Sequence, residues 1–206
     1  MKIVLLAVLW MVWCAMHSFL IDPTVKTWVR VQLPQLLRAY RLLYNGLSLA
    51  TLLPLVEYTR RSCGEVVFAW QGWGLPVRIL LLVNAFLLFW GGAKRYDIRL
   101  FLGITQLRAG ENQVLLSTAK DFLATGVFGM TRHPWYLGSL LALWSVFSEY
   151  SRPVLTATII LSLYLVLGTL LEERKIILEY GDSYRRYQQQ VSMLLPWKWL
   201  KRRLKF

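Results

Sequence analysis

Two polar clusters in the C-terminal half of the chain carry residue types that could bind a small zwitterion. Arg132 and His133 directly precede Pro134, and Glu172 and Glu173 form the second cluster. Proline is favoured in the first turn of a helix, and that end of a helix carries partial positive charge, so a carboxylate could bind beside the Arg-His pair. The two glutamates could accept hydrogen bonds from an ammonium group.

A simpler interpretation is open for both clusters. An Arg-His pair before an apolar run is a common cytoplasmic flank of a membrane span, and Glu-Glu-Arg-Lys is a common solvated helix end. Asp182 could then pair with Arg185 or Arg186 along one helix face. The charge pattern alone favours this simpler interpretation.

The elements that position these clusters are predicted to be membrane helices. Of the 206 residues, 56% are hydrophobic and 17% are charged, against roughly 25% charged in soluble proteins. The apolar residues gather in runs between short charged blocks, which excludes a disordered chain and argues against a soluble globule. The fold class is predicted to be all-α, a polytopic integral membrane protein in which residues 1–206 form a single membrane domain.

Five apolar runs are predicted to be transmembrane helices, because each approaches the length that crosses about 30 Å of hydrocarbon. Residues 1–92 hold three of these runs, and residues 135–171 hold two that form a helical hairpin. The tail 172–206 is predicted to be helical to Tyr180, to break at Gly181 and then to resume. The five runs are 3–21, 42–56, 75–92, 135–147 and 154–171.

The distribution of positive charge predicts the orientation. The segments 22–41, 93–134 and 172–206 contain 19 Lys and Arg, whereas the opposite side of the predicted topology contains five. Because positive residues gather in cytoplasmic loops, the N-terminus is expected outside and the C-terminus in the cytoplasm, at a prokaryotic inner membrane. The net charge of +13 needs no nucleic-acid partner, and none is expected. The basic, Trp-containing stretch 197–205 is expected to anchor the tail to the lipid bilayer.

Two motifs around the predicted hairpin resemble those of isoprenylcysteine carboxyl methyltransferases and related membrane methyltransferases. Residues 123–138, LATGVFGMTRHPWYLG, resemble that family's hydrophobic pair, Thr-x-Gly-x-Tyr and Arg-His-Pro-x-Tyr-x-Gly. Residues 172–187, EERKIILEYGDSYRRY, resemble its Glu-Glu and Phe-Gly-x-x-Tyr-x-x-Tyr motifs, with Pro196 beyond them. The two motifs occur in the family's order, and the resemblance covers about residues 113–196.

The resemblance implies that the chain binds S-adenosyl-L-methionine and transfers its methyl group to a hydrophobic acceptor that enters from the bilayer. It also implies a cytoplasmic cofactor-loop segment at 93–134 and a cytoplasmic helical lid at 172–206. Catalytic roles are expected for Arg132, His133 and Glu173, and no metal is expected. The implied cofactor-binding residues are Gln113, Phe122, Leu123, Phe128, His133, Pro134, Tyr136 and Glu172.

The chain departs from that family at two places. Phe128 stands where the motif has a tyrosine. The carboxyl methyltransferases place a substrate-facing arginine about one helical turn before the glutamates, where residues 168–171 here are GTLL. The methyl acceptor is therefore open among a prenylated peptide, a lipid amine and a small hydrophobic thiol. Adjacent glutamates point about 100° apart on a helix, so at most one of them is expected to hold the cofactor.

The N-terminal half is similar to NnrU-like proteins and membrane thiol methyltransferases, through His17-Ser18 and residues 41–48, RLLYNGLS. This similarity allows an alternative function, a haem-binding membrane protein with His17 as an axial ligand. A hydrogen bond from His17 to Ser18 or to a neighbouring carbonyl is a simpler account of an intramembrane histidine.

Overall fold

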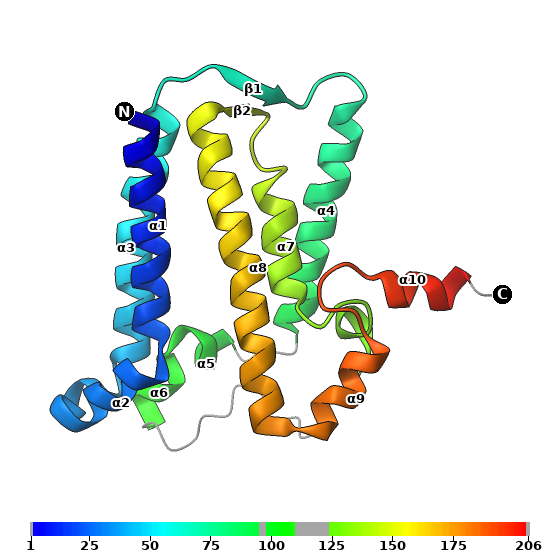
Figure 1. The fold of residues 1–206 in the computed structure, drawn as a ribbon. Helices are drawn as coiled ribbons and strands as arrows, with labels where there is room; N and C mark the ends of the chain where they lie inside the picture. Colours follow the sequence, from blue (N-terminus) through cyan, green and yellow to red (C-terminus); the bar gives the residue numbers. More distant parts are fainter. Residues whose placement is uncertain (1, 95–97, 110–123, 205–206) are drawn as a thin grey trace. The chain divides into compact units, whose positions relative to one another are not determined.

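The structure is a computed structural model that describes residues 2–94, 98–109 and 124–204, and it is mainly helical (Figure 1). The chain divides into two compact units, which are described separately below. The first comprises Met1–Phe68, Tyr96–Leu116 and Tyr150–Leu161, and the second comprises Ala69–Arg95, Ser117–Glu149 and Ser162–Phe206. The helices are α1 (Lys2–Ile21), α2 (Pro23–Gln32), η1 (Pro34–Leu36), α3 (Tyr40–Arg61), α4 (Gly74–Ala93), α5 (Ile98–Leu102), α6 (Ile104–Ala109), η3 (Gly126–Gly129), α7 (Pro134–Leu143), α8 (Arg152–Tyr180), α9 (Asp182–Gln190) and α10 (Trp197–Leu204).

Within the described residues, three helices are long and apolar enough to cross a membrane: α1, α4 and α8. They correspond to three of the five apolar runs that the sequence predicts as spans. Helix α3 is 22 residues long, but it is more polar than these three and includes Glu57, Arg60 and Arg61. Helix α7 has 10 residues and therefore rises about 15 Å, about half the hydrocarbon thickness.

The boundaries of two predicted spans were wrong. Helix α3 extends well beyond 42–56 and continues through Gly46 and Pro54, where the sequence indicates interruptions. A proline removes one backbone hydrogen bond, and α3 is hydrogen-bonded to α1 on both sides of Pro54, through Thr51 and Thr59. Helix α7 ends at Leu143 instead of 147. The carbonyls that follow it have a side-chain donor, because Arg78 donates to Ser145 O (2.8 Å) and to Val146 O (3.1 Å).

The mainly helical structure agrees with the all-α prediction, and it adds a small two-stranded sheet of β1 (Val66–Ala69) and β2 (Glu149–Ser151). Both strands lie in segments between predicted helices. Backbone groups in such segments need partners, and these two segments satisfy one another. In the first unit, Arg152 Nη2 also donates to Glu65 Oε2 at 2.6 Å, next to the paired strands.

In the first unit, α1 and α3 run antiparallel and are joined by a row of side-chain hydrogen bonds (Figure 1). Trp10 Nε1 donates to Thr59 Oγ1 at 3.0 Å, and Trp13 Nε1 donates to Thr51 Oγ1 at 3.1 Å. Trp10 also belongs to a buried apolar cluster with Leu6 and with Ala157 of α8. Polar contacts of this kind hold helices together where the surrounding lipid is as apolar as the side chains.

In the second unit, α4 and α7 pack closely because glycines line their contact. A Cβ at Gly138 of α7 would lie 3.3 Å from Ala85 O and 3.4 Å from Leu88 Cβ, both on α4. At Gly92 a Cβ would overlap the ring of Trp135, whose Nε1 donates to Phe89 O at 3.2 Å. Small residues therefore allow the two helices to approach each other.

Helix α7 also runs antiparallel to the part of α8 that belongs to the second unit. At the C-cap of α7, Trp144 Nε1 donates to Ser162 Oγ at 3.0 Å, and early in α7 the Tyr136 ring lies beside Gly168. Helix α8 then continues to Tyr180, and α9 begins after Gly181, as the sequence predicts. Gly181 has φ +54°, a conformation that other residues rarely adopt, so it permits the sharp change of direction.

Replacing Gly138 by leucine is expected to destabilise the second unit by about 1–3 kcal/mol or more, because the side chain would force α7 away from α4. Gly46→Leu is the matched control: a Cβ there meets nothing within 4 Å, and leucine favours helix by roughly 0.5–1 kcal/mol over glycine. The measurement is the midpoint of heat-induced loss of the monodisperse species in detergent. Equal midpoints for both variants would contradict the close packing of α4 and α7.

Candidate functional site

The segment that enters α7 is fixed by backbone contacts with the residues after α9. Arg132 N donates to Ser192 O at 2.9 Å, and Thr131 Oγ1 donates to Met193 O at 2.8 Å. His133 then forms the N-cap of α7, and Pro134 occupies its first turn, as the sequence predicts. These contacts hold the Arg-His pair at the N-terminal end of the helix, in the second unit.

The two polar clusters that the sequence singles out meet at a buried carboxylate, Glu173. Its two oxygens accept five hydrogen bonds from described residues, and only 8% of its side chain is exposed. Arg132 donates through Nε to Oε1 (2.9 Å) and through Nη2 to Oε2 (2.6 Å), and His133 Nε2 lies 2.7 Å from Oε1. Tyr184 Oη donates to Oε1, and Gln188 Nε2 donates to Oε2. We call these five residues the Glu173 cluster.

The electrostatics of the Glu173 cluster follow from burial and hydrogen bonding. Burial raises the pKa of the Tyr184 hydroxyl, and its hydrogen bond to Glu173 raises the pKa further, so Tyr184 remains a donor. Burial lowers the pKa of the Arg132 guanidinium, but its hydrogen bonds to Glu173 outweigh that effect and the net shift is upward. The Arg-His pair therefore already binds a carboxylate, which belongs to the chain itself.

Glu172 lies in a different environment from Glu173, as two adjacent positions on a helix should. Its side chain is 42% exposed, and its Oε2 lies 3.9 Å from His133 Nδ1. The Tyr136 ring packs against the His133 ring at a centroid separation of 5.7 Å. The structure thus places Glu172, His133, Pro134 and Tyr136, four of the residues proposed for the cofactor, around the start of α7.

Among the remaining residues proposed for the cofactor, the structure describes Phe128 alone. Phe128 is in η3, where its carbonyl accepts a hydrogen bond from Tyr187 Oη at 2.7 Å. Gln113, Phe122 and Leu123 lie outside the described residues.

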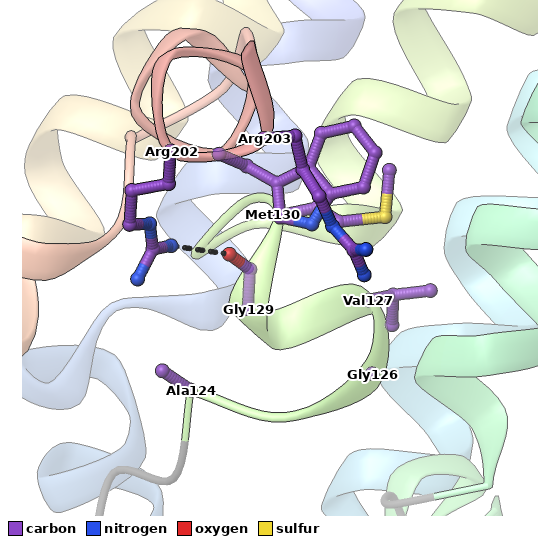
Figure 2. A pocket seen from close by; sticks show the side chains of 8 residues that line it. Ala124, Gly126, Val127, Gly129, Met130, Arg202 and Arg203 are labelled. Carbon is purple, nitrogen blue, oxygen red and sulfur yellow. Dashed lines mark hydrogen bonds between the residues drawn. The ribbon is translucent and has the colours of Figure 1, made fainter. Parts of the chain in front are cut away.

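A cavity of about 640 Å³ opens beside this region, within the size range of small-molecule sites. The segment 124–130, which leads into the Glu173 cluster, forms one side of the cavity. Trp199, Arg202 and Arg203 of α10 form the other side (Figure 2). Arg202 Nη2 donates to Gly129 O at 3.2 Å and so links the two sides.

Sequence reasoning did not assign Tyr184 or Gln188 to the buried carboxylate. A signal for both was present, because residues 184 and 188 are four apart and therefore share one face of α9. Tyr187 points to the segment 124–130, through its bond to the Phe128 carbonyl. Helix α9 thus contacts both the buried carboxylate and the segment that enters α7.

His17, the residue proposed as a haem ligand, has partners on α3. Its Nδ1 lies 3.1 Å from Ser48 Oγ and its Nε2 lies 2.8 Å from Tyr44 Oη. The ring also stacks on Trp13, with ring centroids 5.1 Å apart. Axial ligation of a haem iron would require one of these hydrogen bonds to break.

Glu173→Ala is expected to destabilise the protein by about 3–5 kcal/mol, because it leaves the buried Arg132 guanidinium without its counter-ion. Replacing both partners, in Arg132→Leu/Glu173→Leu, should recover part of this loss since no buried charge remains. Glu172→Ala, at the neighbouring and partly exposed position, is the control and should change stability by less than about 1 kcal/mol. Thermal unfolding in one detergent compares the three. A Glu173→Ala protein as stable as the control would contradict a buried, paired carboxylate.

Comparison with known proteins places the chain in a family. The profile of the family described as NnrU protein matches residues 4–194. Methanethiol S-methyltransferase 1 of Bradyrhizobium diazoefficiens is 30% identical over 198 residues, covering 88% of this chain and 62% of that protein, which is less than two thirds of its length. The methanethiol S-methyltransferase of Pseudomonas deceptionensis is 29% identical, and the match covers 87% of this chain and 67% of that protein. The methanethiol S-methyltransferase of Mycobacterium tuberculosis is 28% identical, and the match covers 90% of this chain and 75% of that protein.

No solved structure matches the chain. The family match covers both halves, including the N-terminal segment with His17 and the C-terminal segment with the Glu173 cluster. The chain therefore belongs to the NnrU protein family.

Proposed function

We propose that the chain is a membrane methyltransferase that transfers a methyl group from S-adenosyl-L-methionine to the sulfur of a small hydrophobic thiol. The observation that carries this proposal is the convergence of His133, Tyr136 and Glu172 at the start of α7, around the buried Glu173. These residues come from the two motifs that resemble membrane methyltransferases. The similarity to methanethiol S-methyltransferases along most of the chain supports the same chemistry.

The residues before the glutamates favour a thiol over a prenylcysteine carboxylate. The carboxyl methyltransferases that the chain resembles place an arginine about one turn before the glutamates, and here that turn offers Gly168 and Thr169. Gly168 lies against Tyr136, and the Thr169 hydroxyl is buried and donates to Leu165 O at 2.8 Å. Without a cation at this turn, a neutral and mainly apolar acceptor suits the site better than a carboxylate does. We therefore propose a small thiol as the acceptor.

Glu172 is the residue we assign to the ammonium group of the cofactor. Its carboxylate is partly exposed, and its Oε2 lies 3.9 Å from His133 Nδ1, beyond hydrogen-bond distance. Glu173, in contrast, accepts five hydrogen bonds and has little capacity for another partner. Glu173 is therefore a positioning residue in this proposal, and it orients Arg132 and His133.

When bound, S-adenosyl-L-methionine supplies a methyl group on a positively charged sulfur. Transfer of that methyl group to the thiol sulfur would require a residue of the chain to accept the thiol proton. His133 is the residue we propose to receive this proton. Its Nε2 is held by Glu173, so in the neutral tautomer that donates there, Nδ1 carries the free lone pair. The chain's other contribution is alignment of the two sulfur centres.

We also propose that residues 1–206 form one membrane domain that crosses the bilayer five times, with α3 and the 135–147 segment as the remaining crossings. Helix α7 is short, but the carbonyls that follow it accept hydrogen bonds from Arg78 and from Trp70 Nε1, which donates to Trp144 O at 3.1 Å. Satisfied carbonyls are what a non-helical segment needs inside a membrane. The N-terminus would then lie outside, and the tail from residue 172 would close the site in the cytoplasm.

The function is tested by incubating the purified chain in detergent with S-adenosyl-L-methionine and methanethiol and measuring dimethyl sulfide in the headspace. The wild type should form product. Glu172→Gln should bind the cofactor about 10- to 100-fold more weakly in calorimetric titration, since one charge-assisted hydrogen bond is lost.

Glu179→Gln is the matched control, because Glu179 is an exposed glutamate of the same helix, outside the proposed site. It should keep both binding and activity. Cofactor binding without methylation of any thiol would contradict the acceptor class. A folded, monodisperse protein that binds no cofactor would contradict the methyltransferase function itself.

The orientation is tested with reporter fusions in a bacterial host. Green fluorescent protein at the C-terminus should fluoresce and alkaline phosphatase there should be inactive, because the tail carries nine Lys and Arg between residues 172 and 206. The same reporters after residue 70, in the predicted external loop, should behave in the opposite way. An active phosphatase at the C-terminus would overturn the proposed topology.

A further inference from the structure

Helix α10 carries positive charge that no described carboxylate neutralises. Four of its eight residues are basic, and none of these four forms an ion pair within 4.0 Å in the described part of the chain. Lys198 Nζ donates to the Gln188 and Gln189 carbonyls, which supply no counter-charge. An anionic partner from outside the chain would balance this helix.

The same helix has an exposed apolar face of the kind that binds membrane surfaces. Trp197 and Leu204 are seven residues apart, so they lie on one side of the helix, and they are 61% and 74% exposed. A short helix with exposed apolar residues on one side and basic residues on the other lies in the plane of the lipid headgroups. The sequence predicts this anchor, but it does not predict that the helix also forms a wall of a cavity.

Two arginines of α10 face that cavity (Figure 2). Arg202 uses one amino group to donate to Gly129 O, and Arg203 lies over the Trp199 ring, with 5.5 Å between its Cζ and the ring centroid. Each guanidinium has five N–H donors, so both retain donors for another ligand. The planar array of donors on arginine matches phosphate oxygens, and the Trp199 ring and Met130 give the cavity an apolar portion.

We propose that this cavity binds the headgroup phosphate of an anionic phospholipid from the membrane in which α10 lies. Positive charge without a counter-ion favours an anionic lipid over a zwitterionic one, which carries its own cation. The lipid would link Arg202 and Arg203 to the bilayer and would stabilise the segment 124–130 that leads to the Glu173 cluster. This proposal does not depend on the methyltransferase function.

The test uses the full chain, delipidated in detergent, with phosphatidylglycerol or phosphatidylcholine added and bound lipid measured by native mass spectrometry. The wild type should retain one phosphatidylglycerol in preference to phosphatidylcholine. Arg202→Gln/Arg203→Gln should lose roughly thirtyfold in affinity for phosphatidylglycerol, because the change removes two basic residues that attract an anionic lipid. Arg185→Gln/Arg186→Gln, which removes two exposed cations of α9, is the matched control and should keep the preference.

A second measurement on the wild type needs no variant. Amide hydrogen exchange of residues 124–130 should slow with phosphatidylglycerol and stay unchanged with phosphatidylcholine. Equal loss of lipid in both double variants, or no preference between the lipids, would overturn the proposal. Equal protection by inorganic phosphate would show a free-anion site instead. Displacement of the lipid by S-adenosyl-L-methionine would assign the cavity to the cofactor.

Discussion

The buried ion pair between Arg132 and Glu173 is the interaction on which the organisation of the second unit depends. It joins the start of α7 to the end of α8, and Tyr184 and Gln188 bring α9 to the same carboxylate. A buried pair of this kind contributes little net stability, but a single unpaired member is very costly. An arrangement of α7, α8 and α9 that separated Arg132 from Glu173 would therefore carry a large cost in free energy.

A second constraint is that helices in lipid cannot rely on the hydrophobic effect to pack against each other. The two units satisfy this constraint differently. In the first unit, indole and hydroxyl groups of α1 and α3 form hydrogen bonds, as Trp10 does with Thr59. In the second unit, Gly92 and Gly138 allow α4 and α7 to approach closely. His17 belongs to the polar row of the first unit, and its contacts with Ser48 and Tyr44 explain an intramembrane histidine without a bound metal.

The separation of roles between two adjacent glutamates links this architecture to the proposed chemistry. Glu173 is saturated with donors and orients Arg132 and His133, whereas Glu172 remains partly exposed beside His133 Nδ1. One helix turn thus provides both a carboxylate that is fully hydrogen-bonded within the chain, Glu173, and a carboxylate that is available to a ligand, Glu172. Helix α10 is linked to the same region, because Arg202 donates to Gly129 O in the segment that enters α7.

The sequence by itself determined the mainly helical membrane class, the first turn of α7 at Pro134, the helix break at Gly181 and the two motifs that carry the candidate site, because these depend on local patterns of apolar, proline, glycine and charged residues. It could not determine that α3 continues through Pro54, that α7 ends at Leu143 or that two loops pair as strands. Only the tertiary structure decided that the Arg-His pair binds Glu173 rather than remaining open to a ligand. The physical reason is that α9 packs over one side of α8, and this packing decides which of the two adjacent carboxylates is buried. Gln188 of α9 donates to the buried one, Glu173, and no local sequence pattern connects these two residues.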